Sequence, residues 1–538
     1  MANFRRARAI RNAIQQLLYF SSILVLVWFS DNTLIDSIYL SRVLGFAILT
    51  LLLLIIDFQK LWKMLAEHPF LILLICALSA PVLFGFPYLD KFYGESQRIN
   101  GTFQLILIVT SMLLGLLITK AWGLKVLLRP IIINGAIVSI VVIASRFITL
   151  QVSTFAPWEA GNGQGGINEN FKSMFIAISC ALHLVFFKSS IKSHVLQYFL
   201  GSSLIIHLTA LAILSSLQGF LLIVLAILFF SSAMKTNLRF GIPIISVSFF
   251  IGYFAFVAIP SLAKVVDSST LERINLARRA IEMLNDAPLI TPNPFRISEN
   301  DFSDVTLTKL SGTEVWIDDV HNVFLNAANT LGILFLAILL VSLIILILDY
   351  LQNVRLFSWE TSAMGAITIA ISLVLIITIL NPIYSFPFCI LIGGYIASRN
   401  KCLKQNLKAK VVPTSSEAKR KSLRIRMASI SIAIMLVIQL AAGTFAILRE
   451  YTTQKETTKV ILMNRSGEAA LSAKSYETLS PLLLRSRDLR FIYEVGRYFY
   501  LQGNCAETGK IKMILRKRSS NHFLTKKLGS LYDECVAR

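Results

Sequence analysis

Long apolar segments alternate with short polar ones along roughly the first 450 residues of the chain. About thirteen of them approach the length that an α-helix needs to cross about 30 Å of hydrocarbon. The pattern therefore predicts an all-α, polytopic membrane protein with about 12–13 transmembrane helices. The predicted spans are residues 17–30, 38–57, 69–86, 102–119, 126–148, 171–187, 195–214, 217–234, 240–260, 321–348, 361–380, 382–398 and 428–448.

The composition agrees with this fold class. Of the 538 residues, 55% are apolar and only 15% are charged, against about 25% charged residues in a typical soluble chain. The formal net charge is +22, and much of the excess lies in short loops between the predicted spans. The positive-inside rule accounts for such loops, so we expect membrane lipids as partners and no nucleic acid.

The basic loops also orient the spans. Arg11 precedes the first span, Lys60 follows the second, and the linker 399–427 carries ten Lys or Arg against one acidic residue. Short loops rich in Lys and Arg stay in the cytoplasm, which predicts a cytoplasmic N-terminus and a cytoplasmic linker. The membrane domain then covers residues 1–448, and the tail, residues 449–538, lies on the opposite side.

Three loops that contain candidate functional residues fall on that opposite side. We call them the outer loops: 87–101, 149–170 and 261–320. Loops as long as 261–320 are usually functional or disordered. Apolar residues recur at helical spacing over 270–285, which predicts a helix in the first half of this loop.

Arginines in and near these loops are candidates for binding phosphate, because a guanidinium can grip a phosphate with two hydrogen bonds. Arg273 has no acidic residue three or four positions away. Arg278 can pair with Glu282 on the same helix face, so a solvated ion pair is the alternative for it. Arg98 and Arg146 are further candidates, although Arg146 could instead extend toward the membrane interface.

His321 begins the span that follows the longest outer loop, and two aspartates that could orient its ring, Asp318 and Asp319, shortly precede it. A histidine with a pKa near neutrality is suited to deprotonate a hydroxyl. Asn322, Asn326 and Asn329 then form one polar stripe on an apolar helix. Lipid cannot satisfy such a stripe, so we expect it to line a cavity or to form hydrogen bonds between helices.

The end of the loop 149–170 is rich in glycine and amides, including Asn168 and Asn170. Such a segment can dip into a cavity and present backbone N–H groups to a ligand. It can also be a flexible turn that ends in an asparagine cap for the following span.

Three of these segments resemble the O-antigen ligase and O-antigen polymerase superfamily of bacterial inner membranes. They are the Arg273-led helix that ends at Ala287-Pro288-Leu289, the His321-Asn322 pair followed by Leu325 and Gly332, and Gly-Gly-Ile-Asn-Glu-Asn at 165–170. The resemblance covers roughly residues 90–400.

The resemblance implies a metal-independent, inverting glycosyltransferase of the GT-C type, without a cofactor. Its donor would be a glycan on undecaprenyl diphosphate at the periplasmic face of a bacterial inner membrane. Arg273, with Arg98 or Arg146, would hold the diphosphate, and His321 would act as the base; Asn168, Asn170, Arg278, Asn322 and Asn326 would help to bind substrate. Ligation to lipid A-core is the first expectation, followed by O-antigen polymerisation and by transfer to protein hydroxyls. A lipid-linked sugar transporter is the alternative from another class.

The tail is helical in pattern and basic, with seventeen Lys or Arg against nine acidic residues. Its segments 491–500 and 524–533 are similar at a spacing of 33, which suggests tetratricopeptide-like helix pairs and a periplasmic protein partner. A small helical cap without a ligand is the alternative. Cys505 and Cys535 would face an oxidising compartment, so we predict a disulfide between them.

Overall fold

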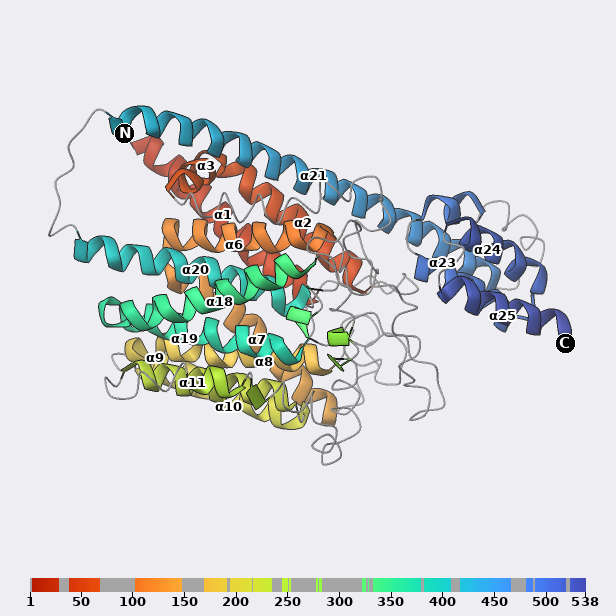
Figure 1. Ribbon diagram of the computed structural model, residues 1–538, viewed down its shortest axis with the longest axis horizontal. Coiled ribbons are helices and arrows are strands. Elements are labelled where there is room, and N and C mark those ends of the chain that lie inside the picture. The colour runs from red at the N-terminus through yellow and green to blue at the C-terminus, as the bar shows by residue number, and fades with distance from the viewer. Residues whose placement is uncertain are drawn as a thin grey trace.

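The computed structural model is helical throughout its described residues (Figure 1). These are residues 2–28, 38–67, 102–147, 169–190, 194–214, 216–234, 244–249, 251–252, 277–278, 280–282, 322–325, 328, 332–378, 382–407, 417–465, 480–486, 489–518 and 523–538.

The helices of the membrane domain run side by side in a bundle (Figure 1). They are α1 (Ala2–Trp28), α2 (Ile38–Ile56), α3 (Phe58–Glu67), α6 (Thr102–Trp122), α7 (Leu124–Phe147), α8 (Glu169–Ala181), α9 (His183–Ser190), α10 (His194–Leu214), α11 (Leu217–Met234), α18 (Ile333–Asn353), α19 (Trp359–Val374), α20 (Pro382–Leu407) and α21 (Glu417–Arg465). Short 3-10 turns, Val354–Leu356 and Leu375–Ile377, follow α18 and α19.

Eight of the described helices are long and apolar enough to cross a membrane, or nine if the bent pair α2–α3 forms one span. The prediction of an all-α, multi-pass membrane protein is confirmed. The predicted spans 171–187 and 382–398 coincide with α8–α9 and α20. The predicted span 69–86 and most of 240–260 lie outside the described residues.

One end of the bundle is joined by ion pairs, and we call it the basic end. Arg11 of α1 pairs with Asp57 after α2, with 2.9 Å between the charged atoms. At the same end the Nε of Arg399 on α20 donates to a carboxylate oxygen of Asp349 on α18 at 2.6 Å. Lys125 of α7 and Glu360 of α19 also face each other there, 3.9 Å apart.

The opposite end is joined by neutral hydrogen bonds, and we call it the loop end. Ser173 near the start of α8 donates to Ser216 before α11 at 2.6 Å. The amide of Gln218 donates to the carbonyl oxygen of Ile377 after α19 at 2.9 Å. In Figure 1 the N-terminus and the start of α21 lie toward the basic end, and the tail helices lie beyond the loop end.

Glycines set the closest helix crossing, between α6 and α20. A Cβ atom added to Gly393 would lie 1.9 Å from the carbonyl oxygen of Met112, and one added to Gly115 would lie 2.0 Å from that of Ile390. The two backbones therefore touch without side chains between them. Small residues allow this close approach, which is a common way for helices to pack in membranes.

Two predicted spans are interrupted by local polar chemistry. The segments Arg42–Ile56 and Phe58–Ala66 meet at an angle of 79°. At this corner the backbone carbonyl oxygen of Asp57 accepts from the N–H of Lys60, and the ammonium of Lys60 pairs with the Asp57 carboxylate at 2.8 Å. The predicted span 171–187 breaks at Leu182, where the ring of His183 bonds to the carbonyl oxygens of Ser179 and Cys180. Such a side-chain insertion into the backbone hydrogen-bond ladder explains the break.

The last membrane helix, α21, has 49 residues and is about 74 Å long. It contains the predicted span 428–448, begins within the linker predicted at 399–427, and continues into the tail. The carboxylate of Glu450 accepts a hydrogen bond of 2.6 Å from Ser486. This buried contact fixes the tail to α21 just beyond its apolar stretch.

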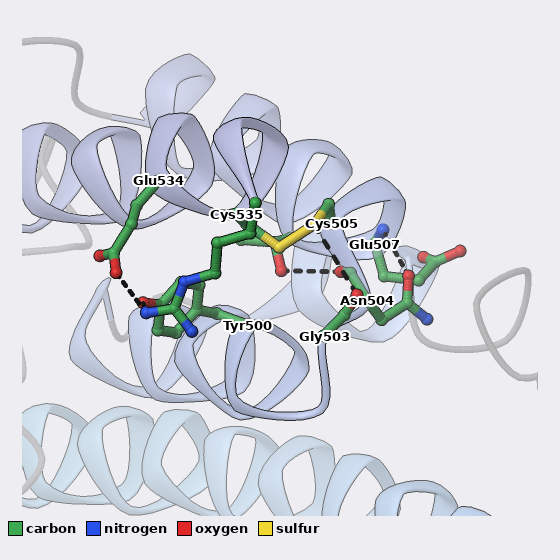
Figure 2. The surroundings of a disulfide bond; sticks show 9 residues. Tyr500, Gly503, Asn504, Cys505, Glu507, Glu534 and Cys535 are labelled. Carbon is green, nitrogen blue, oxygen red and sulfur yellow. Dashed lines mark hydrogen bonds and ion pairs between the residues drawn. A yellow bond between two sulfur atoms is a disulfide. The ribbon is translucent and has the colours of Figure 1, made fainter.

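The tail contains α23 (Leu489–Leu501), α24 (Cys505–Arg518) and α25 (Phe523–Ala537), which share a separate hydrophobic core. The two similar segments of the sequence lie on α23 and α25, the first and third of these helices. Figure 2 shows the disulfide between Cys505 and Cys535, whose Cα atoms are 5.6 Å apart, and the predicted bridge is confirmed. Gly503 adopts a left-handed φ of 69° in the turn between α23 and α24, where glycine is the favoured residue.

Candidate functional site

The described residues that flank the three outer loops meet at the loop end. Thr102 begins α6 after the first outer loop, Phe147 ends α7 before the second, and Glu169 begins α8 after it. Short helical pieces at 277–278, 280–282 and 323–325 lie at the same end of the bundle (Figure 1). The alternating directions of the helices therefore bring these described flanks of the outer loops to one end.

The described part of the predicted helix 270–285 is helical at residues 277–278 and 280–282. Ala277 and Ala280 are fully buried, so this face packs against the protein. Arg278 is half-buried beside them, a position from which its guanidinium could reach a ligand at the loop end.

Asn322 is fully buried, and its side chain shapes the start of a helix. The Oδ1 atom accepts hydrogen bonds from the backbone N–H groups of Phe324, at 2.9 Å, and Leu325, at 3.0 Å. This is the geometry of a helix N-cap. The side-chain oxygen of Asn322, the first asparagine of the predicted polar stripe, therefore caps the helix that follows it.

The other predicted site residues cannot be placed from the described residues. His321, Arg273, Arg98, Asn168 and Asn326 lie outside them. Two more belong to described helices, in the last turn of α7 and the first turn of α8, but their side chains are not among those described; they are Arg146 and Asn170. Their roles remain predictions.

Lys172 is a cation at the loop end that the sequence reasoning missed. It lies in the first turn of α8, two residues after Asn170, and its side chain is only 6% exposed. The next residue, Ser173, forms the hydrogen bond to Ser216 that joins α8 to α11. A buried lysine is costly in a membrane protein and commonly marks a functional position.

Arg42 is a second missed cation, in the second turn of α2, and its side chain is fully buried. The two cations belong to different sides of the bundle, because α2 packs mainly against α1 and α21, whereas α8 packs against α10, α11 and α7. Both lie inside predicted spans, 38–57 and 171–187. A charged residue inside an apolar span was the signal that could have identified them.

The arrangement favours binding of an anion at the loop end. Lysine and arginine side chains held away from water interact strongly with phosphate oxygens. Among the described residues, no three His, Cys, Asp or Glu side chains gather in a way that could hold a metal ion.

Comparisons with known proteins do not assign the chain to a family. No protein-family model matches the chain, and no curated protein matches it either.

Proposed function

We propose that the chain is a glycosyltransferase that moves a glycan from undecaprenyl diphosphate to an acceptor at the periplasmic face of a bacterial inner membrane. One observation carries this proposal: the flanks of all three outer loops meet at the loop end, where Lys172 is buried beside the segment that resembles the ligase and polymerase superfamily. Ligation to lipid A-core is the first candidate reaction.

In this proposal the cations at the loop end hold the donor. The guanidinium of Arg273, with Arg98 or Arg146, grips the diphosphate, and the ammonium of Lys172 adds a point charge nearby. Their charge stabilises the negative charge that develops on the departing phosphate oxygen.

His321 is the proposed base. It removes the proton from an acceptor sugar hydroxyl as the hydroxyl oxygen bonds to the anomeric carbon. The bond between that carbon and the phosphate oxygen breaks on the opposite face, which inverts the anomeric centre. The products are the new glycosidic bond, undecaprenyl diphosphate and a protonated His321.

The disulfide of the tail supports the proposed orientation. Structural disulfides persist in oxidising compartments such as the bacterial periplasm, and the bridged tail lies beyond the loop end (Figure 1). The basic end, with Arg11, Lys125 and Arg399, would then face the cytoplasm, as short basic loops do.

The test is the lipopolysaccharide ladder of a bacterial strain that lacks the gene, together with its lipid-linked glycans. Loss of all O-antigen from core, with long chains stranded on undecaprenyl diphosphate, would identify a ligase. Core that carries a single repeat unit would identify a polymerase. An unchanged ladder would contradict both reactions and direct attention to a protein hydroxyl acceptor, to be read from the glycosylation of periplasmic proteins.

A lipid-linked sugar transporter is the second candidate, because two buried histidines lie in the middle of the bundle, on α9 and α10. Ionisable residues at this depth are common in transporters. The two functions differ in where the donor accumulates after gene loss. A missing transferase leaves the glycan accessible to a glycosidase added to spheroplasts, whereas a missing transporter leaves it protected on the cytoplasmic face.

A further inference from the structure

A pair of buried histidines lies away from both ends of the bundle. His183 is the first residue of α9 and is 7% exposed, and His207 lies in the second half of α10 and is fully buried. Their ring centroids are 5.2 Å apart, and the rings meet edge to face at 72°. The proposed transfer reaction uses neither ring. Ionisable side chains at this depth in a membrane protein are functional candidates by default.

Both ring nitrogens of His207 have hydrogen-bond partners, one on its own helix and one on a neighbouring helix. Nδ1 lies against the carbonyl oxygen of Ser203 on its own helix. Nε2 lies 2.9 Å from the hydroxyl oxygen of Ser179 on α8. That hydroxyl oxygen also lies 3.4 Å and 3.3 Å from the carbonyl oxygens of Ile131 and Ile132 on α7. His207 is thus the centre of a polar contact that joins three helices.

This contact can accept a proton without losing a hydrogen bond. In the neutral ring, Nδ1–H donates to Ser203 and Nε2 accepts from the hydroxyl of Ser179. When Nε2 takes up a proton, it donates to the hydroxyl oxygen instead. The hydroxyl hydrogen of Ser179 then rotates to the carbonyl oxygens of Ile131 and Ile132. Every donor in the cationic state therefore has an acceptor, which reduces the cost of burying the charge.

His183 provides a second basic nitrogen beside this site. Its Nδ1 lies 3.1 Å from the carbonyl oxygen of Ser179 and 3.0 Å from that of Cys180, so Nδ1 carries the hydrogen. The lone pair then resides on Nε2, which is buried and has no hydrogen-bond partner among the described residues. An uncompensated acceptor in an apolar interior is unfavourable, and its negative potential favours a nearby cation.

The surroundings provide no fixed counter-charge that would bind the proton permanently. The described parts of α7, α9, α10 and α11 contain no carboxylate. Cys180 is the titratable neighbour within one turn of His183. The other titratable residues on the packed elements lie nearer the helix ends or on α20; they are Glu169, Lys172, Lys125, Arg129, Arg146, Lys188, His194, Tyr198, Glu360, Tyr384, Cys389, Tyr395, Arg399, Lys401, Cys402 and Lys404.

We propose that His183 and His207 form an intramembrane site that binds one proton, held on His207 between Ser203 and Ser179. A second proton on His183 is excluded, because two cations about 5 Å apart repel strongly away from water. Since Ser179 and its carbonyl partners belong to α8 and α7, the bound proton is linked to how α10 packs against both helices.

Gly135 makes room for this site. A Cβ atom at this position would lie 2.1 Å from the hydroxyl oxygen of Ser179 and 3.0 Å from Nε2 of His207. The hydroxyl can rotate between its two hydrogen-bonding states only because α7 carries glycine at the contact.

The test is the protonation state of His207 in the full-length chain. Protein labelled with 15N-histidine is placed in lipid nanodiscs, and the ring nitrogens are followed by NMR from pH 8 to pH 3.5. Spectra of single His→Gln variants assign the six histidines. We expect both nitrogens of His207 to move to imidazolium positions while the chain stays folded. A His207 ring that remains neutral over the whole range would overturn the proposal.

A matched pair of serine variants tests the geometry. Ser179→Ala removes the acceptor for Nε2–H, and we expect the proton affinity of His207 to fall about tenfold or more. Ser139→Ala is the control, because its hydroxyl donates to the carbonyl oxygen of Gly135 at 2.8 Å and not to either ring. A titration that is the same in Ser179→Ala and in the unmodified chain would show that the proton is not held as proposed.

Discussion

The two ends of the bundle carry charge in different ways. At the basic end, Arg11, Lys125 and Arg399 are partly exposed and each faces a carboxylate. At the loop end the described helix starts carry few charges, but Lys172 and Arg42 are buried. The first pattern orients a membrane protein and ties its helices together. The second holds cations away from full solvation, and we propose that an anion binds there.

The largest expected difference between the ends concerns transfer activity. His321→Ala removes the proposed base, and we expect transfer to fall about 10²- to 10⁴-fold while membrane insertion is unchanged. The measurement is the glycan product formed when the variant complements the deletion strain. Normal product from His321→Ala would refute the assignment of the base.

Arg273→Lys, expressed in the same strain, tests whether a guanidinium is needed to bind the diphosphate of the donor. An ammonium cannot reproduce the two parallel hydrogen bonds of a guanidinium, so we expect severe loss of product despite the retained charge. Full activity of the Arg273→Lys variant would show that Arg273 has only a structural role.

Removing the disulfide tests how much the bridge stabilises the tail. The bridge closes a loop with a sequence separation of 30, for which chain entropy predicts a stabilisation of about 3–4 kcal/mol. We expect the double variant Cys505→Ser, Cys535→Ser to unfold its tail at lower denaturant concentration, measured by proteolysis of the intact chain. Reactive thiols at Cys505 and Cys535 in the unmodified chain without reductant would contradict both the bridge and the proposed orientation.

We expect a smaller effect, on stability alone, from weakening the ion pair at the basic end. Asp349 accepts from Arg399 and also from Asn353 at 3.0 Å. Asp349→Asn should lower the free energy of unfolding by about 1.5–3 kcal/mol, because it weakens charge-assisted hydrogen bonds in a partly buried site. Transfer per folded molecule should not change. A selective loss of activity at equal stability would show that the basic end takes part in the reaction.

The smallest effect concerns the exposed pair Arg538–Glu534 at the end of the tail. The hydrogen bond from Arg538 holds the pKa of Glu534 below its ordinary value. A lowered pKa contributes stability above the ordinary range of a glutamate, and this is lost as the pH falls through the lowered value. Because the pair is fully exposed, we expect only a slight loss of tail stability in acid, absent in Glu534→Gln. A large acid effect that depends on Glu534 would contradict this.

Hydropathy predicted the membrane helices because burial in lipid demands long apolar segments, and α6, α10, α11 and α19 follow it closely. It could not predict the interruptions, which depend on single side chains. The corner at Asp57 and the break at Leu182 arise from local polar contacts that periodicity does not register. The amphipathic spacing of Leu61, Met64 and Leu65 would have indicated that α3 continues as a helix.

The sequence identified only some of the residues that lie at the loop end. Arg278 and Asn322 lie at the loop end, and their predicted roles in substrate binding stay predictions. The cap formed by Asn322 depends on a backbone geometry that the sequence does not specify uniquely. Hydropathy does not single out Lys172 and Arg42, because each lies inside an apolar segment. Burial of a charge becomes visible only once the neighbouring helices are in place.

The most direct test is the affinity of the purified, full-length chain for undecaprenyl diphosphate, because it does not require the acceptor. Lys172→Met removes a buried cation at the loop end, and Lys188→Met is its matched control, an exposed lysine at the basic end of the same helical pair. We predict that Lys172→Met weakens binding at least about tenfold, as expected when a charge-assisted contact is lost, and that Lys188→Met does not change it. Equal affinity in both variants, or a loss confined to Lys188→Met, would contradict the assignment of the donor site to the loop end.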